Sequence, residues 1–115
     1  MIVRQNTPQP FDFDGLKIRD YTSEKETSSS LAVVEAPPGT RHQKAYSKRS
    51  DKYYYLVSGK IRFTVDEESY ELEKGDLCLI EKGQRFSYEN VSLEKATLLL
   101  FHTPSFDLDS EVFIE

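Results

Sequence analysis

Apolar and polar residues alternate with a period of two along most of this chain. Such alternation is typical of β-strands with one buried face. Eight segments show it, at residues 15–21, 30–36, 52–58, 60–66, 69–73, 76–81, 85–90 and 96–102. None of them has the 3.6-residue apolar stripe of an amphipathic helix. The pattern predicts an all-β protein with little or no helix.

Short turn sequences separate the predicted strands. They are APPGT, SGK, DEES, EKGD and EKGQ, which contain the residues that favour tight turns. The polar residues 22–30 are expected to form a surface loop, and NTPQP near the N-terminus an extended lead-in. Eight short strands in 115 residues predict one domain, residues 1–115, built as an antiparallel sandwich or small barrel.

The Ser58-Gly59 turn allows a prediction of strand register. A two-residue hairpin loop at this turn would place Tyr54 opposite Phe63 and Tyr55 opposite Arg62. The face expected to be buried comprises Lys52, Tyr54, Leu56, Ile61, Phe63 and Val65. The outer face then comprises Tyr53, Tyr55, Val57, Lys60, Arg62 and Thr64, where the two tyrosines would flank Arg62. This register places Lys52 among apolar side chains.

Composition and charge exclude several classes of protein. The net charge is −5, yet residues 39–62 hold seven Lys/Arg and one acid, so a basic segment lies within an acidic remainder. A nucleic-acid partner is not expected, because the acidic remainder would repel phosphates. No apolar run is long enough to span a membrane, and the N-terminus lacks the features of a secretory signal. The single cysteine, Cys78, is expected to be a packed, inert thiol in a cytoplasmic protein.

The spacing of glycines resembles that of the cupin superfamily, which is recognised by two motifs. Its first motif is G, five residues, H-x-H, three or four residues, E, six residues, G, and "GTRHQKAYSKRSDKYYYLVSG" at residues 39–59 has that length. "GDLCLIEKGQRFSYEN" at residues 75–90 matches the second motif's glycines and final asparagine. The resemblance implies an antiparallel double-stranded β-helix, or jelly-roll barrel. An N-terminal strand and a C-terminal tail would flank the two motifs.

The metal ligands of the family are not conserved in the residues of this chain. Metal cupins bind iron, manganese, zinc or nickel through three histidines and a glutamate. The corresponding positions here are Ala45, Ser47, Lys52 and Phe86, none of which is a normal ligand. We therefore predict no metal and no cofactor. A metal site that uses His42, with His102 joining it from the last strand, is the less favoured alternative.

The replaced positions predict a different kind of interior. The candidate ligand-binding residues are Lys52, Tyr54, Phe63, Phe86, Tyr88 and His42. Together they would form an aromatic-walled cavity with one cation and several hydroxyls, suited to a sugar, a sugar phosphate or a carboxylate. Lys52 has three possible roles: a base of lowered pKa, an anchor for an anion, or a structural residue paired with an acid of a neighbouring strand.

Four functions stay open at this point. The favoured one is metal-independent binding of a small anionic or hydroxylated ligand. The second is an enzyme of the sugar-nucleotide epimerase or isomerase type, with His42 as base and Tyr54 or Tyr88 as acid. The third is a metal-dependent dioxygenase, decarboxylase or phosphosugar isomerase. The fourth is a structural or regulatory module. Residues Arg41, His42, Lys44, Lys48 and Arg49 are expected in a loop or strand edge at the barrel rim. The resemblance and the outer tyrosines also predict a homodimer.

Overall fold

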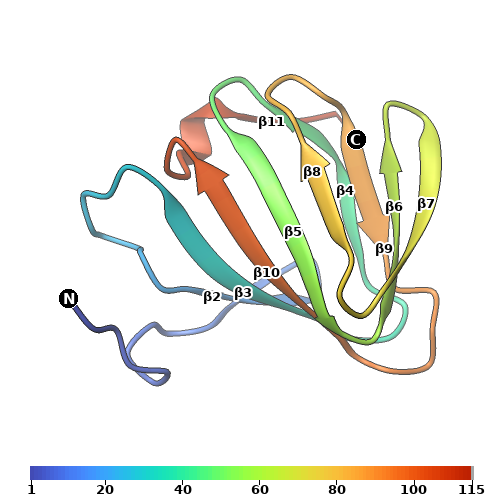
Figure 1. Cartoon of the computed structure of the whole chain (residues 1–115), viewed down its shortest axis with the longest axis horizontal. Coiled ribbons are helices and arrows are strands. Elements are labelled where there is room, and N and C mark those ends of the chain that lie inside the picture. Colours follow the sequence, from blue (N-terminus) through green and yellow to red (C-terminus); the bar gives the residue numbers. More distant parts are fainter. Residues whose placement is uncertain (115) are drawn as a thin grey trace.

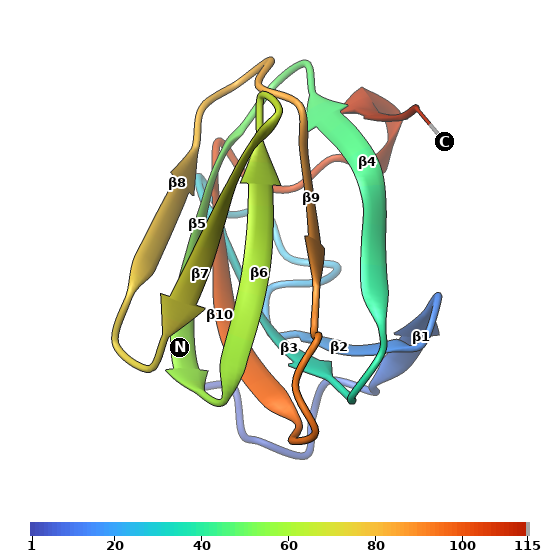
Figure 2. The same cartoon turned by 90° about the vertical axis from the view of Figure 1, so that its right-hand side faces the viewer.

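Two antiparallel β-sheets pack face to face in the computed structural model, which describes residues 1–114 (Figure 1). The first sheet has the order β1 (Phe11–Phe13), β2 (Leu16–Asp20), β3 (Ser30–Ala36), β10 (Ala96–Thr103), β5 (Asp51–Ser58) and β8 (Leu77–Ile80). The second has the order β11 (Glu111–Phe113), β4 (Arg41–Ser47), β9 (Phe86–Glu89), β6 (Lys60–Val65) and β7 (Glu68–Glu73). Figure 2 shows the two layers from the side.

The prediction of an all-β protein is confirmed. Within residues 1–114, the helical structure is one 3₁₀ turn, Leu108–Ser110. That part of the chain contains no helix long and apolar enough to cross a membrane. The eight segments expected to be strands all contain one.

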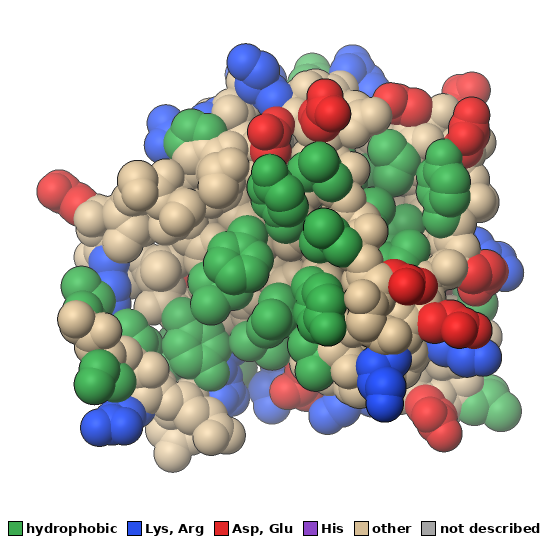
Figure 3. Space-filling view, in the orientation of Figure 1, with side chains coloured by type: hydrophobic (Ala, Val, Ile, Leu, Met, Phe, Trp, Pro, Cys, Tyr) green, Lys and Arg blue, Asp and Glu red, His purple; other side chains and the backbone are tan. Residues whose placement is uncertain are grey.

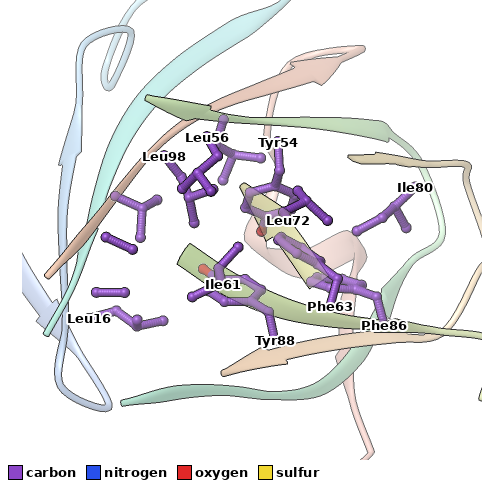
Figure 4. Packing of buried hydrophobic residues seen from close by; sticks show 14 of the residues in the cluster. Leu16, Tyr54, Leu56, Ile61, Phe63, Leu72, Ile80, Phe86, Tyr88 and Leu98 are labelled. Atoms are coloured by element: carbon purple, nitrogen blue, oxygen red, sulfur yellow. The ribbon is translucent and has the colours of Figure 1, made fainter. Parts of the chain in front are cut away.

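The core lies between the sheets and follows the alternation of the strands. In β3, every second residue from Ser30 to Ala36 is buried. The largest fully buried apolar side chains are Leu16, Val34, Tyr54, Leu56, Ile61, Phe63, Ile80, Phe86 and Leu98. Figure 4 shows most of these side chains meeting between the two layers. Their burial from water is the main favourable contribution to folding.

The predicted hairpin between β5 and β6 is wrong, although the faces assigned to its residues are right. β5 pairs with β10 and β8, whereas β6 pairs with β7 and β9 in the other sheet. Arg62 accordingly bonds to Glu71, with a distance of 2.7 Å from Nε to Oε1, and does not lie between Tyr53 and Tyr55. Lys52 and Phe63 are nevertheless both buried, because side chains alternate between the two faces in β5 and in β6, whichever sheet each strand belongs to.

Gly59 makes that passage possible. Its φ is +83°, in the left-handed region that favours glycine. A Cβ at this position would lie 2.7 Å from the Cα of Ala96 and 2.7 Å from the carbonyl oxygen of Lys95. The chain therefore turns in contact with the start of β10 and continues in the opposite layer.

Three strands were not among the eight predicted. Residues 41–47, expected as a loop or strand edge, form β4. Its place in the second sheet puts β4 between β9 and β11. The residues directly after the NTPQP lead-in form β1, and the C-terminal tail contributes β11, each three residues long. Both short strands lie at sheet edges. Three residues are too few for alternation to stand out in sequence.

Candidate functional site

The four positions that correspond to the metal ligands of cupins all face the interior. Ala45, Ser47, Lys52 and Phe86 are each no more than 3% exposed, and Ala45 lies directly opposite Phe86. The Ser47 hydroxyl accepts hydrogen bonds from two backbone N–H groups, at 2.9 and 3.1 Å, so it is engaged in the following turn. These residues do not fit a metal. Nor does any group of three or more His, Cys, Asp or Glu in residues 1–114 form a cluster suited to one.

The predicted aromatic residues do come together between the sheets (Figure 4). The rings of Phe63 and Tyr88 have centroids 4.8 Å apart, and Tyr54 lies 5.1 Å from Phe63 and 5.2 Å from Tyr88. All three are nearly inaccessible to solvent, as is Phe86. Burial, followed by the nearby Tyr88 and Glu111, raises the pKa of Tyr54, and burial raises that of Tyr88. These rings pack against one another between the two sheets.

His42 lies on one side of this aromatic core. Its ring stacks on Tyr88 with centroids 5.1 Å apart, and lies 5.0 Å from the ring of Phe86. Nδ1 is 2.7 Å from the backbone carbonyl oxygen of Gln43. Because that oxygen can only accept, Nδ1 carries the proton and Nε2 keeps a lone pair. Burial lowers the pKa of His42 to about 4, so the ring is neutral at pH 7.

Two phenylalanines that the sequence analysis missed cover His42. Phe13 of β1 has its ring 5.5 Å from the imidazole, and Phe113 of β11 has its ring 6.3 Å away. The two phenylalanine rings are 5.7 Å apart. Strands from both ends of the chain therefore meet over His42. We call the region formed by His42, Phe13 and Phe113 the mouth of the barrel. The signal was present in "FDF" and "EVF", but each is too short to be recognised as a strand.

Lys52 is buried in an ion pair. Its Nζ lies 2.6 Å from Oε1 of Glu111, and the two side chains are 4% and 6% exposed. Burial lowers the pKa of Lys52, while the carboxylate of Glu111 opposes that shift. Of the roles left open by the sequence, the geometry favours the structural one, a lysine paired with an acid, although Glu111 belongs to the opposite sheet and not to a strand next to β5.

His102 is the third member of this buried group. Its Nε2 lies 2.8 Å from Lys52 Nζ, and burial lowers the pKa of His102 to about 3. An ammonium group can only donate, so Nε2 accepts and the ring is neutral. His102 thus points inward as expected, but it hydrogen-bonds to Lys52 and does not join His42.

The hollows found on the surface of the described chain lie elsewhere. One of about 650 Å³ opens between β7 and β8, and it is lined by acids and by Leu72, Cys78 and Tyr70. Another of about 430 Å³ lies on the outer face of the first sheet. None of the hollows described, which range from about 230 to 650 Å³, is lined by His42, Lys52 or Tyr88.

Comparison with known proteins identifies a family. The family described as the cupin domain matches residues 32–102 of this chain. The chain is 36% identical over 64 residues to the tetracenomycin polyketide synthase protein TcmJ of Streptomyces glaucescens, covering 56% of this chain and 43% of that protein. It thus spans less than half the length of this curated relative.

Solved structures share the fold over the whole chain. Streptomyces Pac13, described as a nucleoside dehydratase, has a TM-score of 0.88 and 21% identity, covering 100% of this chain and 91% of that one. Pac13 variants that replace a histidine by glutamine, or a tyrosine by phenylalanine, have been solved with uridine. Oxalate decarboxylase of Lactobacillus farciminis has a TM-score of 0.82 and 20% identity, covering 95% of this chain and 34% of that one. The prediction of a cupin fold is confirmed.

Proposed function

Since the chain belongs to the cupin family, we propose that it binds a small hydroxylated ligand of the sugar or nucleoside class at the mouth of the barrel. The observation that carries this proposal is the neutral imidazole of His42. Its Nδ1 is held by a backbone carbonyl, and its Nε2 is left to accept a hydrogen bond from a ligand hydroxyl. The adjoining rings of Phe13, Phe113 and Tyr88 would pack against the ligand.

The fold neighbours support this class of ligand. Pac13 has been solved with uridine, and its studied variants change a histidine or a tyrosine. These are the residue types that meet here as His42, Tyr54 and Tyr88. The sequence alone also allowed an anionic ligand held by Lys52.

The first test is calorimetric titration of the protein with uridine and with ribose. We expect binding by the wild type and a loss of at least about tenfold in affinity for His42→Gln, which removes the imidazole. Tyr88→Phe and Tyr55→Phe form a matched pair: Tyr88 is buried beside His42, and Tyr55 is on the outer face. An equal effect of these two changes, or unchanged binding in His42→Gln, would contradict the proposal.

We also propose that binding needs no metal. The side chains at the four ligand positions support this, since alanine and phenylalanine have no donor atom and a lysine ammonium repels a cation. Elemental analysis of protein purified without tag or chelator is the test. Near-stoichiometric iron, manganese, nickel or zinc that is lost in His42→Gln would favour the metal-dependent alternative.

An acid–base enzyme is the second candidate, and the free Nε2 of His42 beside a phenol favours it. In epimerase-type cupins an acid holds the histidine base, whereas here the backbone carbonyl of Gln43 takes that place. Incubation of a keto-sugar in D₂O, followed by mass spectrometry, would reveal proton abstraction from carbon. Exchange that depends on His42 would make the protein an enzyme, and no exchange would leave it a binding protein.

We propose a homodimer formed through the outer face of the first sheet. In Figure 3, apolar side chains gather over β5, β8 and β10. We call this surface the outer apolar face, and it consists of Tyr53, Tyr55, Leu77, Leu79, Leu99 and Phe101. Leu77, Leu79 and Phe101 are each more than 40% exposed. A continuous apolar surface with aromatic residues and little charge is typical of an interface between subunits.

The cytoplasm is the compartment that we expect for this dimer. Burial raises the pKa of Cys78 to about 11, so its thiol stays protonated at neutral pH. This supports the prediction of an inert thiol and gives no reason to expect an oxidising compartment.

A further inference from the structure

Glu111 enters the barrel from the C-terminal strand β11. That strand pairs with β4, with Glu111 opposite Ser47 and Phe113 opposite Ala45. Backbone hydrogen bonds from Lys48 N to Ser110 O, at 2.8 Å, and from Ile114 N to Lys44 O, at 2.9 Å, hold it there. The alternation of the strand directs Glu111 and Phe113 to the same side, toward the interior. β11 therefore brings to the barrel one carboxylate and one ring of the mouth.

The charges inside the barrel cancel. Lys52 and Glu111 form one ion pair, and His42 and His102 are neutral at pH 7. Burial keeps Tyr54 and Tyr88 protonated. An anionic ligand placed here would lose its hydration without gaining a free counterion, which is strongly unfavourable. The neutral interior argues against a carboxylate or a phosphate group as the part of the ligand that is buried.

One oxygen of Glu111 lacks a partner. Its Oε1 is held by Lys52 at 2.6 Å, but Oε2 is buried with no hydrogen bond among the described residues. The Glu111 charge contributes to the raised pKa of Tyr54, so the carboxylate lies near the aromatic core. A buried acceptor without a donor costs about 1–3 kcal/mol, and more when it is charged. A carboxylate oxygen can only accept, so the group that satisfies it must be an O–H or N–H donor.

We propose that Glu111 is a ligand-binding residue and that the buried part of the ligand is an uncharged hydrogen-bond donor, such as the hydroxyls of a sugar or nucleoside. This inference rests on the proposed function. Lys52 orients and neutralises Glu111 through Oε1, and Oε2 accepts from the ligand. His42 Nε2 accepts from a second ligand donor. Among the buried side chains of residues 1–114, these two acceptors, with Lys52 already paired, favour a neutral polyhydroxyl compound over its phosphate ester.

The test compares uridine with uridine 5′-monophosphate, two probes that differ by one phosphate group. We expect the monophosphate to bind no more tightly than uridine. Lys52→Met with Glu111→Leu removes the acceptor and leaves no unpaired charge, so this double variant keeps the fold, as far-UV circular dichroism can verify. It should lose at least about tenfold in affinity for uridine. Tighter binding of the monophosphate, with that advantage lost in the double variant, would overturn the inference by making Lys52 an anion anchor.

Two further outcomes separate this inference from the proposed function. Uridine binding that is weakened by His42→Gln, but unchanged in the double variant, would keep the site at His42 and reject Glu111 as part of it. A crystal soaked with uridine gives direct evidence: a uridine oxygen or nitrogen within about 3.2 Å of Oε2 supports the inference. A water alone at that oxygen, with uridine bound elsewhere, rejects it. If neither uridine nor ribose binds, the proposed function and the inference both fail.

Discussion

At the scale of single residues, this barrel replaces the metal-binding side chains of cupins with a buried ion pair and an aromatic core. Lys52 occupies the position of the family's glutamate, and Glu111 comes from β11 to meet it. Removing one member of such a pair leaves an unpaired buried charge. The pair is therefore expected to matter for stability even though burial of both groups is costly.

Lys52→Met should lower the free energy of unfolding by about 3–5 kcal/mol, because it leaves Glu111 buried and unpaired. The double variant Lys52→Met with Glu111→Leu should recover most of that loss. Urea unfolding followed by circular dichroism measures both changes. As a matched control, Lys60→Met affects an exposed lysine whose Nζ is 4.0 Å from Glu73, and it should change stability by less than about 0.5 kcal/mol. A double variant as unstable as Lys52→Met would show that the pair is not the cause.

Acid should destabilise the fold through its two histidines. An unfolded histidine binds a proton near pH 6.5, whereas burial lowers the pKa of His42 to about 4 and that of His102 to about 3. The unfolded chain thus binds more protons below pH 6.5, and stability falls as pH decreases from there toward 4. Each histidine can contribute at most ~2 kcal/mol at pH 5.

The comparison of wild type with His42→Gln, by urea unfolding at pH 7 and pH 5, isolates one of these contributions. The variant should lose less stability than the wild type between the two pH values, because glutamine does not titrate. Identical losses would mean that His42 is accessible to protons in the folded state.

At the scale of elements, the short strands and the turn glycines decide how the barrel closes. β1 and β11 bring Phe13 and Phe113 over His42, and Gly59 carries the chain from one sheet to the other. Gly39 has a similar φ of +81°, but within residues 1–114 nothing beyond its own chain neighbours lies within 4 Å of where its Cβ would be. A comparison of alanine substitutions at Gly39 and Gly59 therefore distinguishes the cost of a left-handed backbone from the cost of a steric clash.

Gly39→Ala should cost about 1–2 kcal/mol, the strain of a left-handed alanine. Gly59→Ala carries the same strain and also forces its Cβ to 2.7 Å from backbone atoms of Lys95 and Ala96. We expect it to cost about 1–3 kcal/mol more. Thermal unfolding of the two variants measures the difference. Equal losses would indicate that β10 shifts freely to make room.

At the scale of the whole molecule, the two sheets differ in what their outer faces offer. The outer apolar face belongs to the first sheet, whereas the exposed side of β6 and β7 carries ion pairs such as Arg62–Glu71. Such an asymmetry is expected if one sheet meets a second copy and the other meets water.

Phe101→Lys should shift the protein from dimer to monomer, since it places a charge on the outer apolar face, directly beside Tyr53. Sedimentation velocity at several concentrations measures the change. Leu93→Lys is the matched control, because Leu93 is 95% exposed in a loop away from that face. A wild type that sediments as a monomer, or an equal effect of both variants, would contradict the dimer.

The alternation of residues by itself determined the all-β class, the burial of Lys52 and Phe63, and the approximate extents of eight strands, because a strand imposes a period of two wherever its partners lie. The glycine spacing determined the family, since those turns need left-handed backbone. The local pattern did not predict which strands pair, because β5 pairs with β10 and β8, which are distant from it in sequence.

Tertiary structure alone decided what surrounds the candidate site residues. Glu111 and Phe113 come from a three-residue strand that has no recognisable pattern of its own, and it pairs with β4 far from it in sequence. Whether aromatic side chains line a cavity or fill it depends on the distance between the sheets, which side-chain packing sets. Residue type and alternation predicted that Lys52 would be buried, but only the packed sheets decided that Glu111 would meet it, because a buried charge takes whichever partner the fold brings within reach.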